Sequence, residues 1–396
     1  MGRMTANPPH QGPRDDERDP FSSPVVDRVR ETGNVWNLPG GQIRLPEVFG
    51  FCRGVNRALT MLQQAVAELA RQGGSGTGGK KLKLMLLGQI IHNPWVNCYF
   101  ENLGVKILSR EQIENPGKYI TADDCAVIPA FGVKLPVERQ LKAIGCRIVD
   151  TSCGDVRRLW SWTDRASADG YGVLIFGRAD HDETVVTKSR LEASGGRYLV
   201  AGNLDQTRRF CELITRRRDP GEFARLFSPR ATNSPDLQPF ERLAQVSQTT
   251  MLHDETMAVR ELVRQAFVER FGPDQAGERL LFQPTVCRAT QARQTAAVEL
   301  CRHGCDLVVV VGGFGSSNTR HLYELARGLA PAWFIETADA IHSQREIETF
   351  DPAVGPRTVT DWLPAGRPIT IGVLAGASSP EIVVGQVLER LATFLG

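Results

Sequence analysis

The chain has 396 residues, of which 41% are hydrophobic and 23% charged, and its formal net charge at pH 7 is +2. This composition is typical of a globular protein of two or three domains, and so small a charge argues against nucleic acid or an anionic membrane as a partner. No run of 18 apolar residues occurs, which argues against a membrane span, and the acidic N-terminal stretch has no apolar core. We therefore expect a cytoplasmic protein.

Residues 1–40 are expected to form a disordered or loosely ordered extension with one short helix over 24–32. From residue 41 onward, apolar runs alternate with small-residue turns and helical patterns. Strands are expected at 42–48, 82–87, 126–128, 146–149, 173–176, 242–246, 307–311 and 369–374, and the glycine-rich run 73–79 is expected to be a surface linker. Such alternation predicts parallel sheets, which bind ligands beyond the carboxyl ends of their strands.

Three cysteines, Cys52, Cys153 and Cys287, divide this pattern into three cycles. Each lies where an apolar run gives way to a helix, at spacings of 101 and 134 residues (153 − 52 and 287 − 153). The pattern predicts three similar α/β domains in a pseudo-threefold trefoil. Their expected bounds are 41–152, 153–286 and 287–396, and an Arg- and Pro-rich stretch at about 204–240 is interpreted as a surface insertion of the second domain.

A thiol at the start of a helix meets unpaired backbone N–H groups, which favour the thiolate. Three converging thiolates predict one metal centre, either zinc or an iron–sulfur cluster with one iron free of protein ligand. Structural zinc sites use closely spaced cysteine pairs, so the spacing favours the cluster. The chain has nine cysteines in all, and the other six are predicted to be packing residues: Cys98, Cys125, Cys146, Cys211, Cys301 and Cys305.

Polar side chains recur at the strand ends that follow the cysteine turns. They include His92, His181 with Glu183, Gln248 with Thr249, Ser316 with Ser317 and Asn318, and Ser378. Singly, each has an ordinary explanation as a helix cap or a loop histidine. Because they fall at corresponding positions of one repeated unit, they together predict a site for a small phosphorylated ligand at helix N-termini.

Nine stretches resemble the 4-hydroxy-3-methylbut-2-enyl diphosphate reductase family, and they cover the chain from about residue 42 to its C-terminus. They are Gly50–Val55, Ile91–Pro94, Pro129–Gly132, Val149–Cys153, His181–Thr184, Ser247–Leu252, Cys287–Gln291, Gly312–Thr319 and Ala375–Pro380. The resemblance implies a trefoil of three α/β domains around a 4Fe-4S cluster that Cys52, Cys153 and Cys287 hold, with one open iron for the substrate's allylic hydroxyl. It also implies reductive dehydroxylation to isopentenyl and dimethylallyl diphosphate, the last step of the methylerythritol phosphate pathway.

The resemblance further implies roles for single residues. Glu183 would donate the proton, and Thr249 would orient the hydroxyl and relay protons. The implied diphosphate ligands are His92, His181, Ser316, Ser317, Asn318 and Ser378. The implied partners are the diphosphate substrate and ferredoxin or flavodoxin as the electron donor, with no nucleic acid or membrane, in a monomer or homodimer.

The chain departs from the better-known bacterial pattern at Phe131, where many relatives have a histidine. This departure resembles the plant and cyanobacterial branch. Arg178 is interpreted either as a diphosphate partner or as a surface residue, and Asp155 is given no role. Two other functions stay open: a hydratase or different reductase on the same three-cysteine cluster, and a non-catalytic redox or iron sensor.

Overall fold

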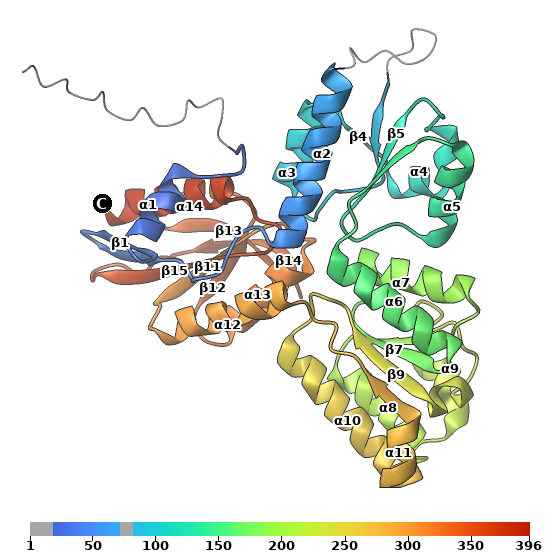
Figure 1. Ribbon diagram of the computed structural model, residues 1–396. Helices are drawn as coiled ribbons and strands as arrows, with labels where there is room; N and C mark the ends of the chain where they lie inside the picture. Colours follow the sequence, from blue (N-terminus) through green and yellow to red (C-terminus); the bar gives the residue numbers. More distant parts are fainter. Residues whose placement is uncertain (1–18, 72–81) are drawn as a thin grey trace, which may run out of the picture.

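The computed structural model describes residues 19–71 and 82–396, so the expected linker at 73–79 and the first 18 residues of the expected extension lie outside the described residues. Three lobes, each built on one small sheet, meet at a common centre (Figure 1). This arrangement confirms the expected α/β trefoil.

The first lobe is a four-stranded parallel sheet in the order β4-β3-β5-β6. Its strands are β3 (Leu84–Leu86), β4 (Lys106–Ile107), β5 (Cys125–Ile128) and β6 (Arg147–Asp150), and its helices are α2 (Arg53–Arg71), α3 (Pro94–Asn102), α4 (Arg110–Glu114) and α5 (Leu135–Ile144). Leu84 and Leu86 pack on the side of α2 and α3, whereas Met85 faces α5. Both faces of the sheet are covered, which explains the continuous apolar run of β3.

The second lobe has a parallel sheet in the order β10-β9-β7-β8. Its strands are β7 (Gly172–Phe176), β8 (Tyr198–Ala201), β9 (Leu243–Ser247) and β10 (Leu280–Phe282), and its helices are α6 (Gly154–Ala168), α7 (Asp182–Ala193), α8 (Leu204–Ile214), α9 (Phe223–Leu226), α10 (His253–Phe271) and α11 (Pro273–Arg279). Leu174 and Phe176 pack with α8 and α10, while Val173 and Ile175 pack with α6 and α7.

The third lobe is a five-stranded sheet in the order β1-β2-β15-β11-β12, in which only the β1–β2 pair is antiparallel. Its strands are β1 (Val35–Leu38), β2 (Gly41–Arg44), β11 (Leu307–Val311), β12 (Ala332–Ile335) and β15 (Ile369–Ala375), and a hairpin of β13 (Glu346–Asp351) and β14 (Gly355–Thr360) extends the lobe. Helices α1 (Pro24–Glu31) and α14 (Glu381–Leu395) cover one face, and α12 (Arg288–Arg302) and α13 (Ser317–Arg327) cover the other.

The sheet membership of residues 35–44 differs from the expected domain boundary. β2 pairs with β15, which lies more than 300 residues further along the chain, so β2 belongs to the third lobe and not to the domain expected at 41–152. The helix expected at 24–32 is present as α1, but the expectation of loose order is wrong for residues 19–40. Val26 and Val29 of α1 are buried in the core of the third lobe.

The stretch 204–240 is also more than a surface insertion. Phe210 of α8, Phe223 of α9 and Phe240 are all buried in the core of the second lobe. Most arginines of this stretch are exposed. Their number made the stretch look like a surface segment in the sequence, although its phenylalanines are buried. Another expectation is wrong for Cys98, which is exposed, whereas the other five cysteines expected in packing are buried or half-buried.

Across residues 19–71 and 82–396, no helix combines the length and apolar character needed to cross a membrane. Helix α1 packs against α14, which lies at the other end of the chain. A Cβ atom at Gly385 of α14 would lie 2.0 Å from the Ser23 hydroxyl oxygen, the N-cap of α1. The absence of a side chain at Gly385 therefore lets α1 seat on α14.

The Gly385→Ala variant is expected to lose about 1–3 kcal/mol of unfolding free energy, because the added methyl group must displace α1. Denaturant unfolding measures this loss. The matched control is Gly277→Ala in α11, where a Cβ meets nothing within 4 Å. There the substitution should instead stabilise the helix by about 0.5–1 kcal/mol. Equal effects of the two substitutions would contradict the proposed contact.

Candidate active site

Three cysteines lie where three helices begin, near the point at which the lobes meet. Cys153 and Cys287 are the N-cap residues of α6 and α12, and Cys52 directly precedes α2. The Cys52 sulfur accepts a hydrogen bond from the Val55 amide at 3.4 Å. A Cβ at Gly54 would lie 2.8 Å from the Cys153 sulfur and 3.8 Å from that of Cys52, so these two thiols share one space.

Cys287 lies close enough to Cys52 for the charges of the two thiols to interact. Burial, with a smaller contribution from a negative charge on Cys52, raises the pKa of the Cys287 thiol to about 11. Burial also raises the pKa of Cys153, with Cys52 again contributing. Among the described residues, no three His, Cys, Asp or Glu side chains are close enough to hold a single metal ion. The raised pKa values mean that the two thiols are neutral near pH 7 unless a positively charged group lies beside them.

Glu183 and Thr249 form a buried pair beside this centre. The Thr249 hydroxyl donates to one carboxyl oxygen of Glu183 at 2.5 Å, and the Thr249 amide donates to the other at 2.7 Å. Glu183 is 3% exposed, and burial raises its pKa to about 7, with a smaller contribution from Asp155. The Thr249 carbonyl oxygen accepts from the Cys287 amide at 3.0 Å, which places the pair next to the turn of that cysteine.

His181 is the N-cap residue of α7, and its Nδ1 atom accepts from the Glu183 amide at 3.3 Å. The proton of the neutral ring therefore lies on Nε2, which is free to donate. Burial lowers the pKa of His181 to about 3, with His92 and Arg178 contributing. Burial likewise lowers the pKa of His92, whose ring meets that of His181 edge-on at 5.4 Å and stacks on Phe131 at 4.7 Å.

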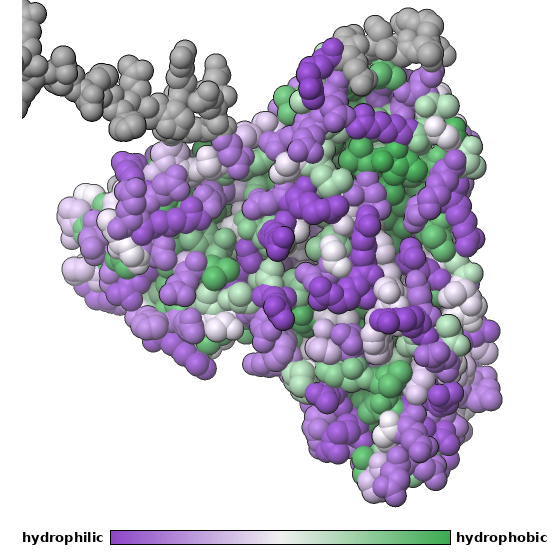
Figure 2. Space-filling model, viewed as in Figure 1, coloured by the Kyte–Doolittle hydropathy of each residue, from purple (hydrophilic) through white to green (hydrophobic). Residues whose placement is uncertain are grey.

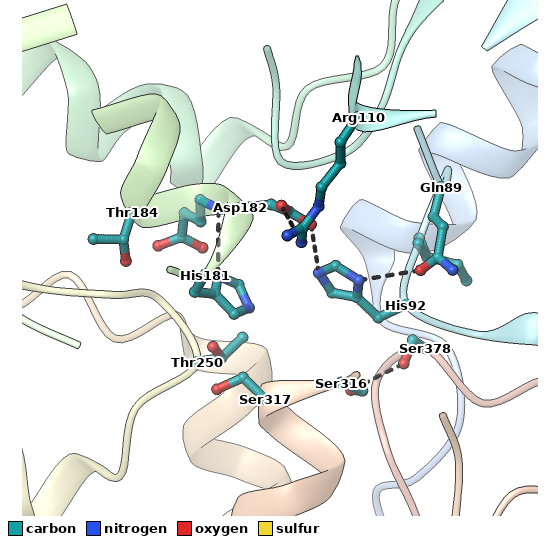
Figure 3. Close-up of polar contacts among 12 residues, drawn as sticks. Gln89, His92, Arg110, His181, Asp182, Thr184, Thr250, Ser316, Ser317 and Ser378 are labelled. Carbon is teal, nitrogen blue, oxygen red and sulfur yellow. Dashed lines mark hydrogen bonds and ion pairs between the residues drawn. The ribbon is translucent and has the colours of Figure 1, made fainter. Parts of the chain in front are cut away.

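The third lobe contributes hydroxyl groups to the same space (Figure 3). Ser316 caps α13, and its oxygen accepts from the Ser378 hydroxyl at 3.1 Å. The Ser317 oxygen accepts from the Gln248 side-chain amide at 3.1 Å. The rings of His92 and His181 lie opposite these hydroxyls in the close-up, so groups from all three lobes surround one volume.

In Asn318 of this group, both polar side-chain atoms lack a hydrogen-bond partner among the described residues. The residue is 3% exposed, so both atoms are buried. Leaving such groups unpaired costs about 1–3 kcal/mol, so a buried unpaired amide needs an explanation, and a ligand, an ion or a bound water can each provide it. The first turn of α13 adds its free N–H groups, and the helix dipole favours an anion there.

A cavity of about 810 Å³ opens beside the two histidines. Its lining includes His92, Phe131, His181 and three arginines, Arg110, Arg178 and Arg320. In the space-filling view, hydrophilic residues predominate around the region where the lobes meet (Figure 2). The lining also contains Lys134 and the carboxylates Glu114, Asp180 and Asp182, so four cationic side chains face three anionic ones and the cavity has a small excess of positive charge, which favours an anionic ligand.

The residues named as candidates from the sequence thus fall into two neighbouring groups. The cysteines with Glu183 and Thr249 form one group, and the histidines, serines and Asn318 form the other. Arg178 is 42% exposed and pairs with Asp180 at 3.4 Å, while Phe131 provides the surface on which His92 stacks. The negative charge of Asp155 makes a small contribution to the raised pKa of Glu183.

The family resemblance gave no role to three residues of the site: Gln248, which the sequence placed among the polar strand-end side chains, and Asp182 and Arg110, which the sequence did not single out. Gln248 is 1% exposed and joins the second lobe to the third, since its side chain also accepts from the Arg178 amide at 3.2 Å and donates to Thr250 at 2.7 Å. Asp182 lies 3.6 Å from His92 and 3.2 Å from Arg110. The position of Asp182 between His181 and Glu183 was the only available signal for it, and Arg110 gave none.

Comparison with known proteins gives consistent matches. Residues 43–392 match the family model described as LytB protein. The 4-hydroxy-3-methylbut-2-enyl diphosphate reductase of Synechococcus sp. is 34% identical over 94% of this chain and 90% of its own length, and that of Gloeobacter violaceus is 33% identical over 97% and 90%.

Two solved structures show the same architecture. One is an (E)-4-hydroxy-3-methyl-but-2-enyl diphosphate reductase, described as the terminal enzyme of the non-mevalonate pathway. It is 25% identical, with a TM-score of 0.52 over 89% of this chain and 99% of its own. The Plasmodium falciparum E-1-hydroxy-2-methyl-but-2-enyl-4-diphosphate reductase shares the fold at 19% identity, with a TM-score of 0.62 over 88% of this chain and 87% of its own.

Proposed function

Because the chain belongs to the LytB protein family, we propose that it is a 4-hydroxy-3-methylbut-2-enyl diphosphate reductase. The reaction makes isopentenyl and dimethylallyl diphosphate and is the last step of the methylerythritol phosphate pathway. The allylic C–O bond breaks, the oxygen leaves as water, and a carbon of the allyl group gains hydrogen. The change consumes two electrons and two protons for each substrate.

The observation that carries this proposal is the buried pair of Glu183 and Thr249. A carboxyl group with a pKa of about 7 is partly protonated near neutral pH, so it can donate a proton and be recharged from solvent. The Thr249 hydroxyl lies 2.5 Å from the carboxyl group and can pass that proton to a substrate oxygen. A leaving hydroxyl needs such a proton source, because hydroxide is a poor leaving group.

The diphosphate would bind to the second group of residues. His181 would donate from Nε2, and Asn318 from its unpartnered amide nitrogen. Ser316, Ser317 and Ser378 would add hydroxyl donors at the N-terminus of α13, and His92 would face the same anion. A bound diphosphate would raise the pKa of both histidines and bring them closer to the charged state. Fixing the diphosphate there orients the carbon chain toward the cysteines.

Cys52, Cys153 and Cys287 would hold a 4Fe-4S cluster with one iron free of protein ligand. The three thiols fit such a group because they come from separate segments, are half-buried, and begin or directly precede three helices, with the Cys52 and Cys153 sulfurs beside one glycine, Gly54. When bound, the cluster would supply the electrons and a Lewis-acidic iron for the hydroxyl oxygen. Ferredoxin or flavodoxin is the proposed electron donor, since each delivers one electron at a time.

The test is anaerobic reconstitution with iron and sulfide, followed by Mössbauer spectroscopy and a turnover assay with a reduced one-electron donor. We expect one iron to differ from the other three and to respond to the hydroxylated diphosphate. Isopentenyl diphosphate is the control ligand, because it keeps the diphosphate but lacks the hydroxyl group. A reconstituted protein that leaves the hydroxylated substrate unreduced would refute the proposal.

A further inference from the structure

Arg293 of α12 is a buried cation without a carboxylate partner among the described residues. Its side chain is enclosed, with 5% of the residue exposed. The guanidinium donates instead to backbone carbonyl oxygens: to Gly50 from Nε at 3.2 Å and Nη2 at 2.8 Å, and to Ala289 from Nη1 at 2.8 Å. These acceptors are neutral, so the hydrogen bonds satisfy the donors but leave the charge uncompensated. A buried charge in this state is costly.

The position of Arg293 points to what compensates it. Arg293 follows Cys287 by six residues on α12, and its acceptor Gly50 precedes Cys52 by two residues. The guanidinium thus links the helix that begins at one cluster cysteine to the turn that carries another. Burial lowers the pKa of Arg293, and the opposing charges that raise it come from Cys52 and Cys287.

We propose that Arg293 is the built-in counter-charge of the iron–sulfur cluster and sets its reduction potential. The inference rests on the proposed function, since it requires that the three cysteines hold the cluster. One electron passes from the reduced carrier, which is oxidised, and the cluster site gains one negative charge without a proton. A fixed positive charge stabilises that added charge, so Arg293 raises the potential and favours electron acceptance.

A purely structural role makes a different prediction. In that case Arg293 would matter only because its bonds to the Gly50 carbonyl hold the turn before Cys52, where Gly50 has a left-handed φ of +68°. Two substitutions separate charge from bonding. Arg293→Gln keeps a donor for a carbonyl oxygen but removes the charge, whereas Arg293→Lys keeps the charge but loses the forked geometry.

The experiment is a redox titration of the reconstituted holoprotein with small mediators, followed by low-temperature EPR. For Arg293→Gln we expect the one-electron reduction equilibrium to fall about tenfold, which is a shift of about 59 mV to more negative potential. Arg293→Lys should stay close to the unsubstituted protein. The matched control is Arg288→Gln, directly after Cys287, whose exposed charge is screened by solvent and should shift the potential much less.

Each outcome decides the question. An unchanged potential in Arg293→Gln with a full cluster would overturn the proposal, as would an equal shift in Arg293→Lys. If Arg293→Gln takes up no cluster, then loading of Arg293→Lys at the original potential supports the charge role, and failure of both variants assigns Arg293 to the fold alone. If the unsubstituted protein itself takes up no cluster, the proposed function has failed first, and iron analysis reveals this separately.

Discussion

Replacing Glu183 by glutamine is expected to lower kcat for the dehydroxylation by about 10²–10⁴-fold, the usual contribution of a positioned general acid. Glutamine can still accept from the Thr249 amide, so the local geometry should survive while the transferable proton is lost. Anaerobic single-turnover kinetics measures the effect. The control is Glu192→Gln on the same helix, where the exposed carboxylate accepts from the Tyr198 hydroxyl at 2.6 Å, far along α7 from the site. Full activity of Glu183→Gln would refute the assigned role.

The pH dependence gives the same assignment a second test. Activity should fall as pH rises through about 7, because Glu183 must be protonated to act, and this fall should be absent in Glu183→Gln.

The free energy of unfolding should also fall as pH rises through about 7. The folded pKa is raised above the unfolded value of 4.5, so the folded protein binds the proton more tightly. Its stabilising contribution is complete below pH 4.5 and is lost as pH rises through 7, in total about 3 kcal/mol. Glu183→Gln should therefore gain relative stability between pH 5 and 8.

The strands were predictable where both faces of a sheet are covered. Residues 307–311 form a continuous apolar run, and β11 is buried throughout between two helical layers. The convergence of the cysteines and polar loops followed from the same pattern, since parallel strands deliver their carboxyl ends to one edge. The three thiols could thus be proposed as a metal centre from the sequence pattern alone, before any contact between them was known.

The features that the sequence did not predict depend on contacts between residues far apart in the chain or on strands without a clear apolar pattern. Residues 41–44 join β15 through backbone hydrogen bonds, which carry little sequence signal, so their neighbours along the chain suggested the wrong domain. The β13–β14 hairpin was missed because its exposed residues show little apolar alternation. Gln248 and Arg293 act through side chains that cross between lobes, and nothing in the local sequence marks such a role.

Replacing Asn318 by leucine is expected to lower kcat/KM for the diphosphate substrate by roughly 10–100-fold while leaving stability unchanged or raising it by about 1 kcal/mol. Hydrogen bonds to charged groups contribute about 1.5–3 kcal/mol, which accounts for the loss. The stability effect has the opposite sign, because the Asn318 amide is buried without a partner among the described residues. Kinetics and denaturant unfolding of the same preparation test both effects.

Asn233→Leu is the matched control, because both ends of that amide are already bonded. Its nitrogen donates to the Gly196 carbonyl at 2.8 Å and its oxygen accepts from the Tyr198 amide at 3.0 Å. There the substitution should cost about 1–3 kcal/mol of stability and leave kcat/KM alone. If Asn318→Leu were destabilised to the same degree, the unpaired amide would have a structural partner and not a ligand. The contrast is expected because the Asn318 amide has no hydrogen-bond partner among the described residues, and the proposed diphosphate would supply one, whereas the Asn233 amide already has its partners.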